Sequence, residues 1–200
     1  MPSMAKSKFD ANSVGSKVLR HCVSATSPVC SDPNLVRQIC LGASVAHAVG
    51  CWEGYIEAVL REFVAKVRVQ SNRKIWTLIS QFEAIVDRMA GGLNTPSWDN
   101  VRSLLVDIAG LDPYSAWVWP TLFSNPTDTK LFFEGILKVR HSFAHGFPIP
   151  HDVSGLTTPG SLDETYVDNA ISCIEFFVST TDQLLEHELK HRHSCMPGWN

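Results

Sequence analysis

The sequence contains no hydrophobic run that could cross a bilayer. Its longest weakly polar stretch, LGASVAHAVGCW at residues 41–52, is shorter than the roughly 20 residues of a transmembrane helix and includes His47. The N-terminal residues MPSMAKSKFDANSVGSK lack the apolar centre of a secretory leader. We therefore expect a protein without a membrane partner, located in the cytoplasm.

The sequence also lacks a Cys-x-x-Cys pair, the usual signature of a zinc site or a redox motif. In a chain without a secretory leader, scattered cysteines are expected to stay reduced and to fill small spaces in the core. Neither a metal nor a cofactor is expected. The six cysteines are Cys22, Cys30, Cys40, Cys51, Cys173 and Cys195.

No segment shows the period-two alternation of a β-strand, whereas apolar residues recur every three or four positions along much of the chain. This pattern predicts an all-α protein, an antiparallel helical bundle with long first and last helices. The composition, 44% hydrophobic and 18% charged, is that of an ordinary globular domain. Helices are expected over residues 13–22, 32–68, 72–89, 98–109 and 127–144, and a long last helix is expected from the capping box at residues 161–164 to about residue 190.

Residues 1–31 are serine-rich and weakly patterned, so we interpret them as an N-terminal arm or irregular lead-in that contains the short helix. The main helical domain then covers residues 32–200, with a helical insertion around 91–126. Asp32-Pro33 supplies an N-cap and a first-turn proline for the first long helix. Ser161-Leu-Asp-Glu164 has the pattern of a capping box that starts the last one.

The net charge is only −3, but the charges are unevenly distributed along the chain. Residues 163–188 carry seven acidic residues and no lysine or arginine, whereas residues 61–74 carry a single acid. A basic segment on an acidic chain fits either a solvated helix face or a local phosphate-binding patch. The basic residues of this segment are Arg61, Lys66, Arg68, Arg73 and Lys74.

The segment VRHSFAHG at residues 139–146 places an arginine and two histidines at the end of a predicted helix, ahead of a proline-rich loop. Arg140 and His145 are about 140° apart around a regular helix, so they do not share a face. They can converge only if Gly146 lets the helix end distort, or if a second copy of the chain brings its own pair alongside. The helix dipole alone also favours basic side chains at such a position.

The chemistry of this group suits cleavage of an RNA phosphodiester by its own 2′-hydroxyl. A histidine can accept or donate a proton near neutral pH, and an arginine can bind phosphate oxygens through its fork of donors. Neither contribution requires a metal. DNA is not a substrate for this reaction because it lacks the 2′-hydroxyl.

The stretch RHSFAHG resembles the motif of the HEPN superfamily, which has an arginine, a polar residue, three further residues and a histidine. The segment AHAVGCWEGYIEAVLREF at residues 46–63 resembles the glutamate-bearing early helix of the same superfamily. Its Trp52-Glu53 pair is similar to the RiboL-PSP-HEPN branch in particular. The resemblance leaves out residues 1–30 and 91–126.

The resemblance implies a metal-independent endoribonuclease that acts as a homodimer, in which two motifs form one composite active site. Arg140 would be the phosphate clamp and His145 the acid or base, while His141 orients the clamp or shares the proton transfer. Glu53 would support the arginine or the histidine, the alternative being an exposed helix acid. The basic segment 61–74 could bind the RNA backbone. Many relatives are toxins or antiviral defence effectors, which implies an antitoxin or a regulatory partner protein.

Two other functions remain open at this point. In the first, the chain is a non-catalytic HEPN-like binding or assembly module of a defence or signalling complex, and Arg140 and His145 satisfy carbonyl groups at the helix end. In the second, the chain is a zinc hydrolase that uses His187 and His191 with a third ligand. A solvated helix end fits these last two histidines better.

The loop at residues 146–160 is either a lid over the cleavage site or the connection to the last helix. His151 within it is a candidate for substrate contact, with a simple surface position as the alternative. Phe147 stands two residues after His145, where one toxin branch has a tyrosine that its antitoxin modifies by nucleotidylation. Because phenylalanine lacks the hydroxyl, that mode of neutralisation is not expected here.

Overall fold

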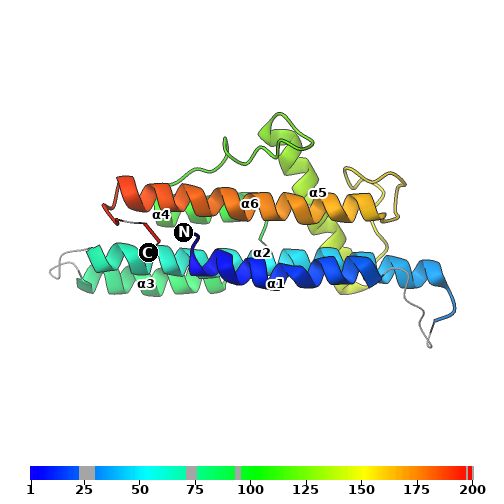
Figure 1. The fold of residues 1–200 in the computed structure, drawn as a ribbon, viewed down its shortest axis with the longest axis horizontal. Coiled ribbons are helices and arrows are strands. Elements are labelled where there is room, and N and C mark those ends of the chain that lie inside the picture. The colour runs from blue at the N-terminus through cyan, green and yellow to red at the C-terminus, as the bar shows by residue number, and fades with distance from the viewer. Residues whose placement is uncertain (23–29, 71–75, 93–95, 197, 200) are drawn as a thin grey trace. The chain divides into compact units, whose positions relative to one another are not determined.

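The computed structural model describes residues 1–22, 30–70, 76–92, 96–196 and 198–199, with side chains at all of these except residues 69–70 and 76–79. Within these ranges the regular structure is helical, and the one extended pairing is an isolated bridge between Thr158 and Ser161. The protein is therefore all-α, as the sequence predicts. The helices, drawn in Figure 1, are α1 (Met4–His21), α2 (Pro33–Gln70), α3 (Trp76–Gly91), α4 (Trp98–Ala109), α5 (Pro126–His145) and α6 (Glu164–His191).

The predicted and observed helices agree most closely where capping residues mark their ends. α4 occupies the predicted range 98–109, with Ser97 as its N-cap and Gly110 in the left-handed conformation, at φ 67°, as its C-cap. α2 begins directly after Asp32, whose carboxylate accepts the backbone N–H of Asn34 at 2.9 Å. Local hydrogen bonds of single capping residues, from the side chain or from the backbone, thus set these boundaries.

The N-terminal segment differs from the prediction. Instead of an irregular lead-in with a short helix at 13–22, a single helix, α1, spans Met4–His21. Its buried side chains include Ser13 and Ser16 as well as Ala5 and Phe9. Because small polar residues occupy much of the buried side, the recurrence of large apolar residues that indicates helices elsewhere is weak here.

The start of the last helix also differs from the prediction. Its N-cap is Asp163, whose carboxylate accepts the backbone N–H of Tyr166 at 2.8 Å. The Glu164 side chain does not close a capping box with Ser161, because both of its oxygens are bound by the Arg37 guanidinium. An aspartate directly before the helix takes the role that the pattern assigned to the serine.

The chain folds into two compact units, each built from segments that are distant in the sequence. α1, α2 and α6 contribute residues to both units, whereas α3 and α4 belong to the first and α5 to the second. The first unit comprises Met1–Asp10, Trp52–Trp117 and Phe177–Asn200, and the second comprises Ala11–Cys51 and Val118–Phe176.

An aromatic cluster forms the core of the first unit. The ring of Trp117 lies edge-on to Trp98 at 5.0 Å and 5.5 Å from Phe177, and Trp52 lies 6.2 Å from Trp117. These rings are almost completely buried. The Trp117 indole N–H donates to the Thr181 hydroxyl at 3.1 Å, so the ring is buried without leaving this donor unsatisfied.

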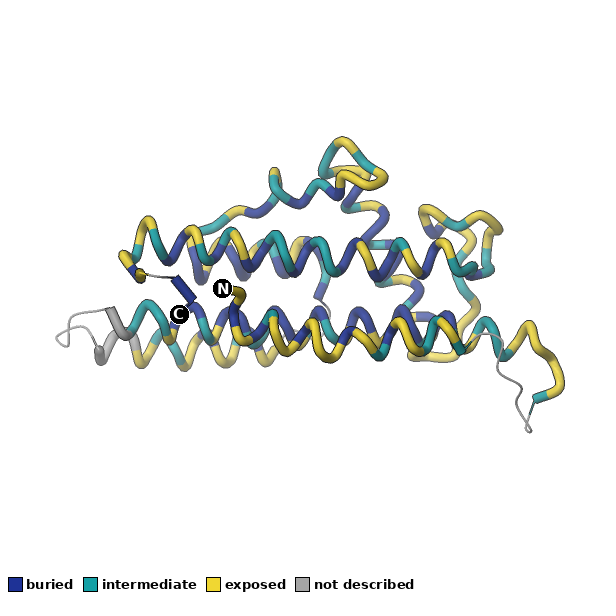
Figure 2. Tube along the Cα trace, in the orientation of Figure 1, coloured by how far each residue is buried: buried dark blue, intermediate teal, exposed yellow. Residues whose placement is uncertain are grey.

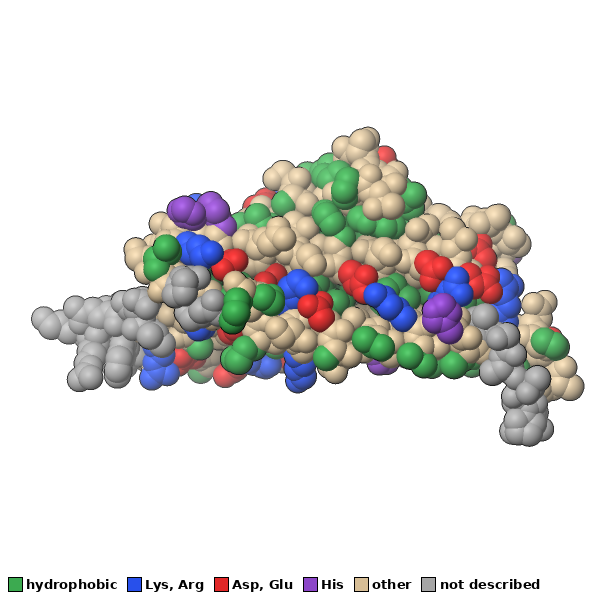
Figure 3. Space-filling model, viewed as in Figure 1, with side chains coloured by type: hydrophobic (Ala, Val, Ile, Leu, Met, Phe, Trp, Pro, Cys, Tyr) green, Lys and Arg blue, Asp and Glu red, His purple; other side chains and the backbone are tan. Residues whose placement is uncertain are grey.

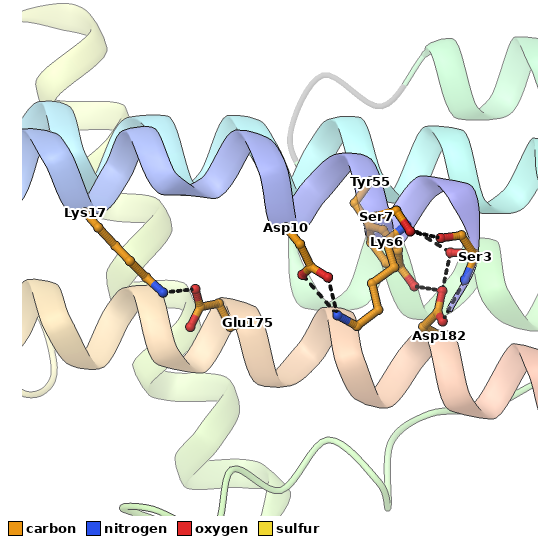
Figure 4. A network of polar contacts seen from close by, with 8 residues as sticks. All are labelled: Ser3, Lys6, Ser7, Asp10, Lys17, Tyr55, Glu175 and Asp182. Atoms are coloured by element: carbon orange, nitrogen blue, oxygen red, sulfur yellow. Dashed lines mark hydrogen bonds and ion pairs between the residues drawn. The ribbon is translucent and has the colours of Figure 1, made fainter. Parts of the chain in front are cut away.

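Asp182 organises a polar network in the same unit, seen in Figure 4. Its carboxylate accepts hydrogen bonds from the backbone N–H of Ser3 at 3.2 Å, from the Ser3 hydroxyl and from the Tyr55 hydroxyl at 3.5 Å. Burial raises the pKa of Asp182, and the hydrogen bonds from Ser3 oppose that rise. Glu62 accepts the backbone N–H groups of residues 4–5, so the first donors of α1 are satisfied by a side chain of α2.

In the second unit, the beginnings of α2 and α6 are joined by paired polar contacts. The Arg37 guanidinium binds the Glu164 carboxylate through Nε at 2.9 Å and through a terminal nitrogen. The Gln38 side chain bonds both backbone polar groups of Leu162, donating at 2.8 Å and accepting at 2.9 Å. α5 crosses the segments of α2 and α6 in this unit at a steep angle (Figure 1).

Burial follows one side of each helix, as the alternation of dark and light segments in Figure 2 shows. No helix among the described residues combines the length and the apolarity that crossing a membrane requires. Even α2, the longest described helix, alternates buried and exposed positions. Its buried residues in the second unit include Leu41, Val45, Ala48 and Val49, and in the first unit Ile56, Val59, Leu60 and Phe63.

Acid should weaken the contact between α2 and α6. Hydrogen bonds from Arg37 lower the pKa of Glu164 from 4.5 to about 2. Because the folded-state value lies below the unfolded one, ionised Glu164 stabilises the fold above pH 4.5, and this contribution is lost as the pH falls toward 2. We expect Glu164→Gln to lower the free energy of unfolding at neutral pH by about 1 kcal/mol, since the pair is partly exposed and screened.

Urea unfolding of the wild type and of Glu164→Gln at neutral pH and at about pH 3 measures this contribution. The difference between their free energies of unfolding should be smaller in acid. Glu134→Gln is the matched control, because the ion pair of Glu134 with a described residue is the one to Lys130 on the same helix, at 3.7 Å. A difference for Glu164→Gln that stays constant down to pH 3 would contradict the prediction.

Candidate active site

The motif residues stand at the C-terminal end of α5. The helix continues through His145 and stops at Gly146, whose φ of 67° lies in the left-handed region that favours glycine. The backbone N–H of Phe147 donates to the carbonyl of Ser142 at 2.8 Å, and that of Gly146 to Phe143 at 3.4 Å. This pair of bonds is a Schellman motif. The helix therefore ends one residue beyond the predicted range of 127–144.

The same backbone bonds leave little for the motif side chains to cap. The carbonyls of Ser142 and Phe143 are already satisfied by the backbone. In the described part of the chain, neither Arg140 nor His145 donates a hydrogen bond to a carbonyl at the helix end. No hydrogen bond among the described residues therefore supports a purely structural role, in which these two side chains would bind carbonyl groups at the helix end.

Three aromatic rings meet at this helix end, and we refer to His141, His145 and Phe147 as the ring cluster. The two imidazoles are one turn apart, with centroids separated by 4.4 Å. The Phe147 ring stacks near-parallel on His145 at 5.8 Å and lies 6.1 Å from His141. All three side chains are exposed, and neither imidazole forms a hydrogen bond or an ion pair with a described residue. Both histidines are thus accessible for proton transfer.

Arg140 stands apart from the ring cluster. Because α5 stays helical up to His145, the two positions remain about 140° apart, and the helix end does not distort to bring them together. The half-buried Arg140 guanidinium has no ion pair within the described ranges, whereas Arg20 and Arg102 each hold a carboxylate with two nitrogens. An arginine without a carboxylate partner keeps its donors for an external anion.

The last turn of α5 is held against α2 by the approach of a ring to a glycine. A methyl group on Gly42 would lie 2.7 Å from Cδ2 of Phe143, so only glycine accommodates the ring as it stands. Ser142, the neighbour of Phe143, is buried, while Phe143 keeps 38% of its surface exposed. This contact within the second unit fixes the end of α5 and, with it, the direction of the ring cluster.

The loop at residues 146–160 packs back along α5. Val153 is buried, with its Cγ1 3.3 Å from the position that a Cβ on Gly135 would take. Lys138 and Asp152 form an ion pair at 2.5 Å. These contacts lie on turns of α5 that precede the end of the motif, which favours the connection to α6 over a lid.

Two of the arginines predicted to bind RNA are engaged with carboxylates. Nε of Arg61 lies 2.7 Å from Asp87, and Arg68 lies 3.0 Å from Glu83, all within the first unit. On the face drawn in Figure 3, acidic and basic side chains are intermixed rather than gathered by sign. Binding of RNA by Arg61 or Arg68 would therefore require these ion pairs to open.

The remaining predicted contacts belong to the first unit or lie outside the described residues. Lys66 is half-buried on α2 without an ion pair to a described residue, and Arg73 and Lys74 lie outside the described residues. Glu53 is also half-buried on α2 and belongs to the first unit, whereas the motif belongs to the second. The supporting role of Glu53 stays a prediction.

The other candidate histidines lie outside the ring cluster. His151 is exposed in the loop, its imidazole 3.3 Å from where a Cβ of Gly160 would be. His187 and His191 have ring centroids 4.1 Å apart near the end of α6. Among the described residues, no three His, Cys, Asp or Glu side chains are grouped so that they could hold a metal ion.

Phe147 is the member of the cluster whose position the sequence analysis did not anticipate. The signal that could have revealed it is Gly146, because a left-handed glycine folds the next residue back toward the last helical turn. Gly42 had no comparable signal. Its importance depends on which side chain of a distant helix lies above it.

Comparison with known families links the chain to one of them. The sequence model described as RiboL-PSP-HEPN matches residues 21–187. The matched region contains the motif at the end of α5 and also residues 91–126, which the resemblance of short motifs did not cover. Comparisons with curated proteins and with solved structures gave no significant match.

The contact between Gly42 and Phe143 predicts that Gly42→Ala has opposite effects on stability in the presence and in the absence of the Phe143 ring. Alanine is favoured over glycine in a helix by about 1 kcal/mol, but at position 42 the methyl group would overpack against the ring. We expect Gly42→Ala to destabilise the protein by about 1 kcal/mol and to stabilise it once Phe143→Ala has removed the ring. Thermal unfolding of the single and double variants measures both effects.

Gly50→Ala on the same helix is the control, since nothing lies within 4 Å of its added Cβ, and it should raise stability. If Gly42→Ala has the same effect with and without the Phe143 ring, the packing described here is wrong.

Proposed function

The chain belongs to the RiboL-PSP-HEPN family, and on that premise we propose that it is a metal-independent endoribonuclease. Membership of the family points to an RNA-related function of HEPN type. The observation that carries the finer proposal is the exposed imidazole pair of His141 and His145, on the same helix as an arginine that has no carboxylate partner among the described residues. The cellular role that we propose is that of a toxin or antiviral effector, controlled by an antitoxin or a regulatory protein.

In the proposed reaction, one imidazole removes the proton of the 2′-hydroxyl, and the 2′-oxygen attacks the adjacent phosphorus. The bond from phosphorus to the 5′-oxygen breaks, and a protonated imidazole gives that oxygen its proton. The products are a 2′,3′-cyclic phosphate and a free 5′-hydroxyl. Two accessible imidazoles 4.4 Å apart suit these two proton transfers, so His145 takes one and His141 takes the other.

Arg140 is proposed to bind the non-bridging phosphate oxygens and to stabilise the charge that develops on them. Since it lies about 140° from His145 around α5, we propose that the arginine of a second copy serves the imidazole pair of the first. A homodimer then completes two half-sites at once. Glu53 is proposed as a supporting residue, and Arg61, Lys66, Arg68, Arg73 and Lys74 as contacts to the RNA backbone.

The first prediction from this proposal concerns cleavage of total cellular RNA in excess EDTA. The wild-type protein should cut and leave 2′,3′-cyclic phosphate ends, and His145→Ala should lose roughly 10²-fold or more of the rate with an unchanged melting temperature. Arg140→Lys should also lose activity, because an ammonium keeps the charge but not the planar fork. Gel analysis and end-group labelling measure these outcomes.

The chain offers matched controls for both substitutions. His151→Ala removes an exposed histidine outside the ring cluster, and Arg88→Ala removes another exposed arginine without an ion pair to a described residue. Both variants should cut like the wild type. Equal cutting by wild type and His145→Ala would reject the assignment. A loss of stability in His145→Ala, without cutting by the wild type, would favour the non-catalytic binding module.

A second prediction tests whether the site is shared between copies. Arg140→Ala and His145→Ala should each be inactive alone, but mixing and subunit exchange should restore activity. When the two variants are mixed in equal amounts, about half of the dimers contain one copy of each variant. Each mixed dimer has one complete site out of two, so about a quarter of the wild-type activity should return. No recovery, although mixed dimers are present, would show that each site uses the arginine and histidine of one chain.

A further inference from the structure

Phe147 is a large apolar side chain that the structure holds in solvent. It keeps 59% of its surface exposed, more than the 38% of Phe143, four residues earlier in the chain. Its backbone is nevertheless fixed, because its N–H is bonded to Ser142 and it follows the left-handed Gly146. The ring is therefore presented by a defined turn rather than by a loose loop.

The ring of Phe147 is also aligned with the imidazole proposed for proton transfer. It stacks on His145 with an angle of 25° between the ring planes and a centroid distance of 5.8 Å. No polar atom of the Phe147 side chain competes for hydrogen bonds with His141 or His145. What the ring offers to a ligand is an apolar π-face next to the two imidazoles.

We propose that Phe147 is a base-stacking platform that positions the nucleotide next to the scissile phosphate. The proposal rests on the ribonuclease function proposed above. Bases of single-stranded RNA stack on aromatic side chains, whereas bases within a duplex are already stacked and paired. A base on Phe147 carries its own ribose and phosphate into the neighbourhood of His145. Phe147 therefore makes the site select unpaired nucleotides, and it acts on binding more than on proton transfer.

The test uses an unstructured oligouridylate and a blunt RNA duplex of equal length. Phe147→Ala should raise KM for the oligouridylate about tenfold, with a smaller change in kcat. The ratio of kcat/KM for the oligouridylate to kcat/KM for the duplex should therefore fall. Phe147→Trp should keep the wild-type KM. Phe147→Leu keeps the apolar bulk without the π-face, so it should behave like the alanine variant. Leu131→Ala, at an exposed apolar residue of α5, should change nothing.

Binding measured without cleavage separates this proposal from the ribonuclease function. In a His145→Ala background, the tryptophan of Phe147→Trp should be quenched by the oligouridylate, beyond the signal of the chain's native tryptophans. If the wild type cuts RNA but Phe147→Ala leaves KM unchanged, the stacking proposal is wrong and the ribonuclease function stands. The same conclusion follows if Phe147→Leu has the KM of the wild type. Loss of the dimer in Phe147→Ala overturns it in favour of a subunit contact. Absence of both cutting and RNA binding overturns both proposals.

Discussion

The left-handed backbone of Gly146 decides where α5 stops and which side chains stand at its end. Glycine adopts this conformation without the steric cost that a Cβ would bring. The helix therefore ends directly after His145, and the chain folds back to place Phe147 beside the imidazoles. The Schellman bonds satisfy the carbonyls of Ser142 and Phe143 with the backbone itself. Arg140 and His145 consequently make no hydrogen bond to these carbonyls, and the contact of Phe143 with Gly42 holds the helix end in place.

Arg140 differs from several other arginines of the described chain, which are held in ion pairs. In the second unit, Arg20 binds Asp168 and Arg37 binds Glu164, and in the first unit Arg61 binds Asp87. Such pairs leave little net positive potential at the arginines concerned. Arg140 is not neutralised in this way by a described residue. Arg140 therefore keeps its donors for an external anion, whereas Arg61 and Arg68 of the basic segment would first have to leave their carboxylates.

The sequence predicted the fold class and most helix boundaries because these depend on local patterns, as at Asp32 and Gly146. It missed α1 because that helix buries serines, which no apolar periodicity reveals. It misplaced the cap of α6 because Arg37, far away in the chain, engages Glu164. At the site, the sequence supplied the residue types, but the ring cluster and the Gly42 contact depend on tertiary geometry that a linear pattern does not encode.

The geometry of α5 also constrains how a ribonuclease of this kind would be assembled. One copy of the chain presents the imidazole pair and Phe147 together, but Arg140 faces another direction around the helix. In the proposed ribonuclease, folding of one copy would supply the proton donor and acceptor without the phosphate clamp. Association of two copies would complete the site without any rearrangement of the helix end, which is already fixed by backbone hydrogen bonds. In such a design the step that creates activity is assembly, and a partner protein that covers the exposed ring cluster would block assembly and substrate access together.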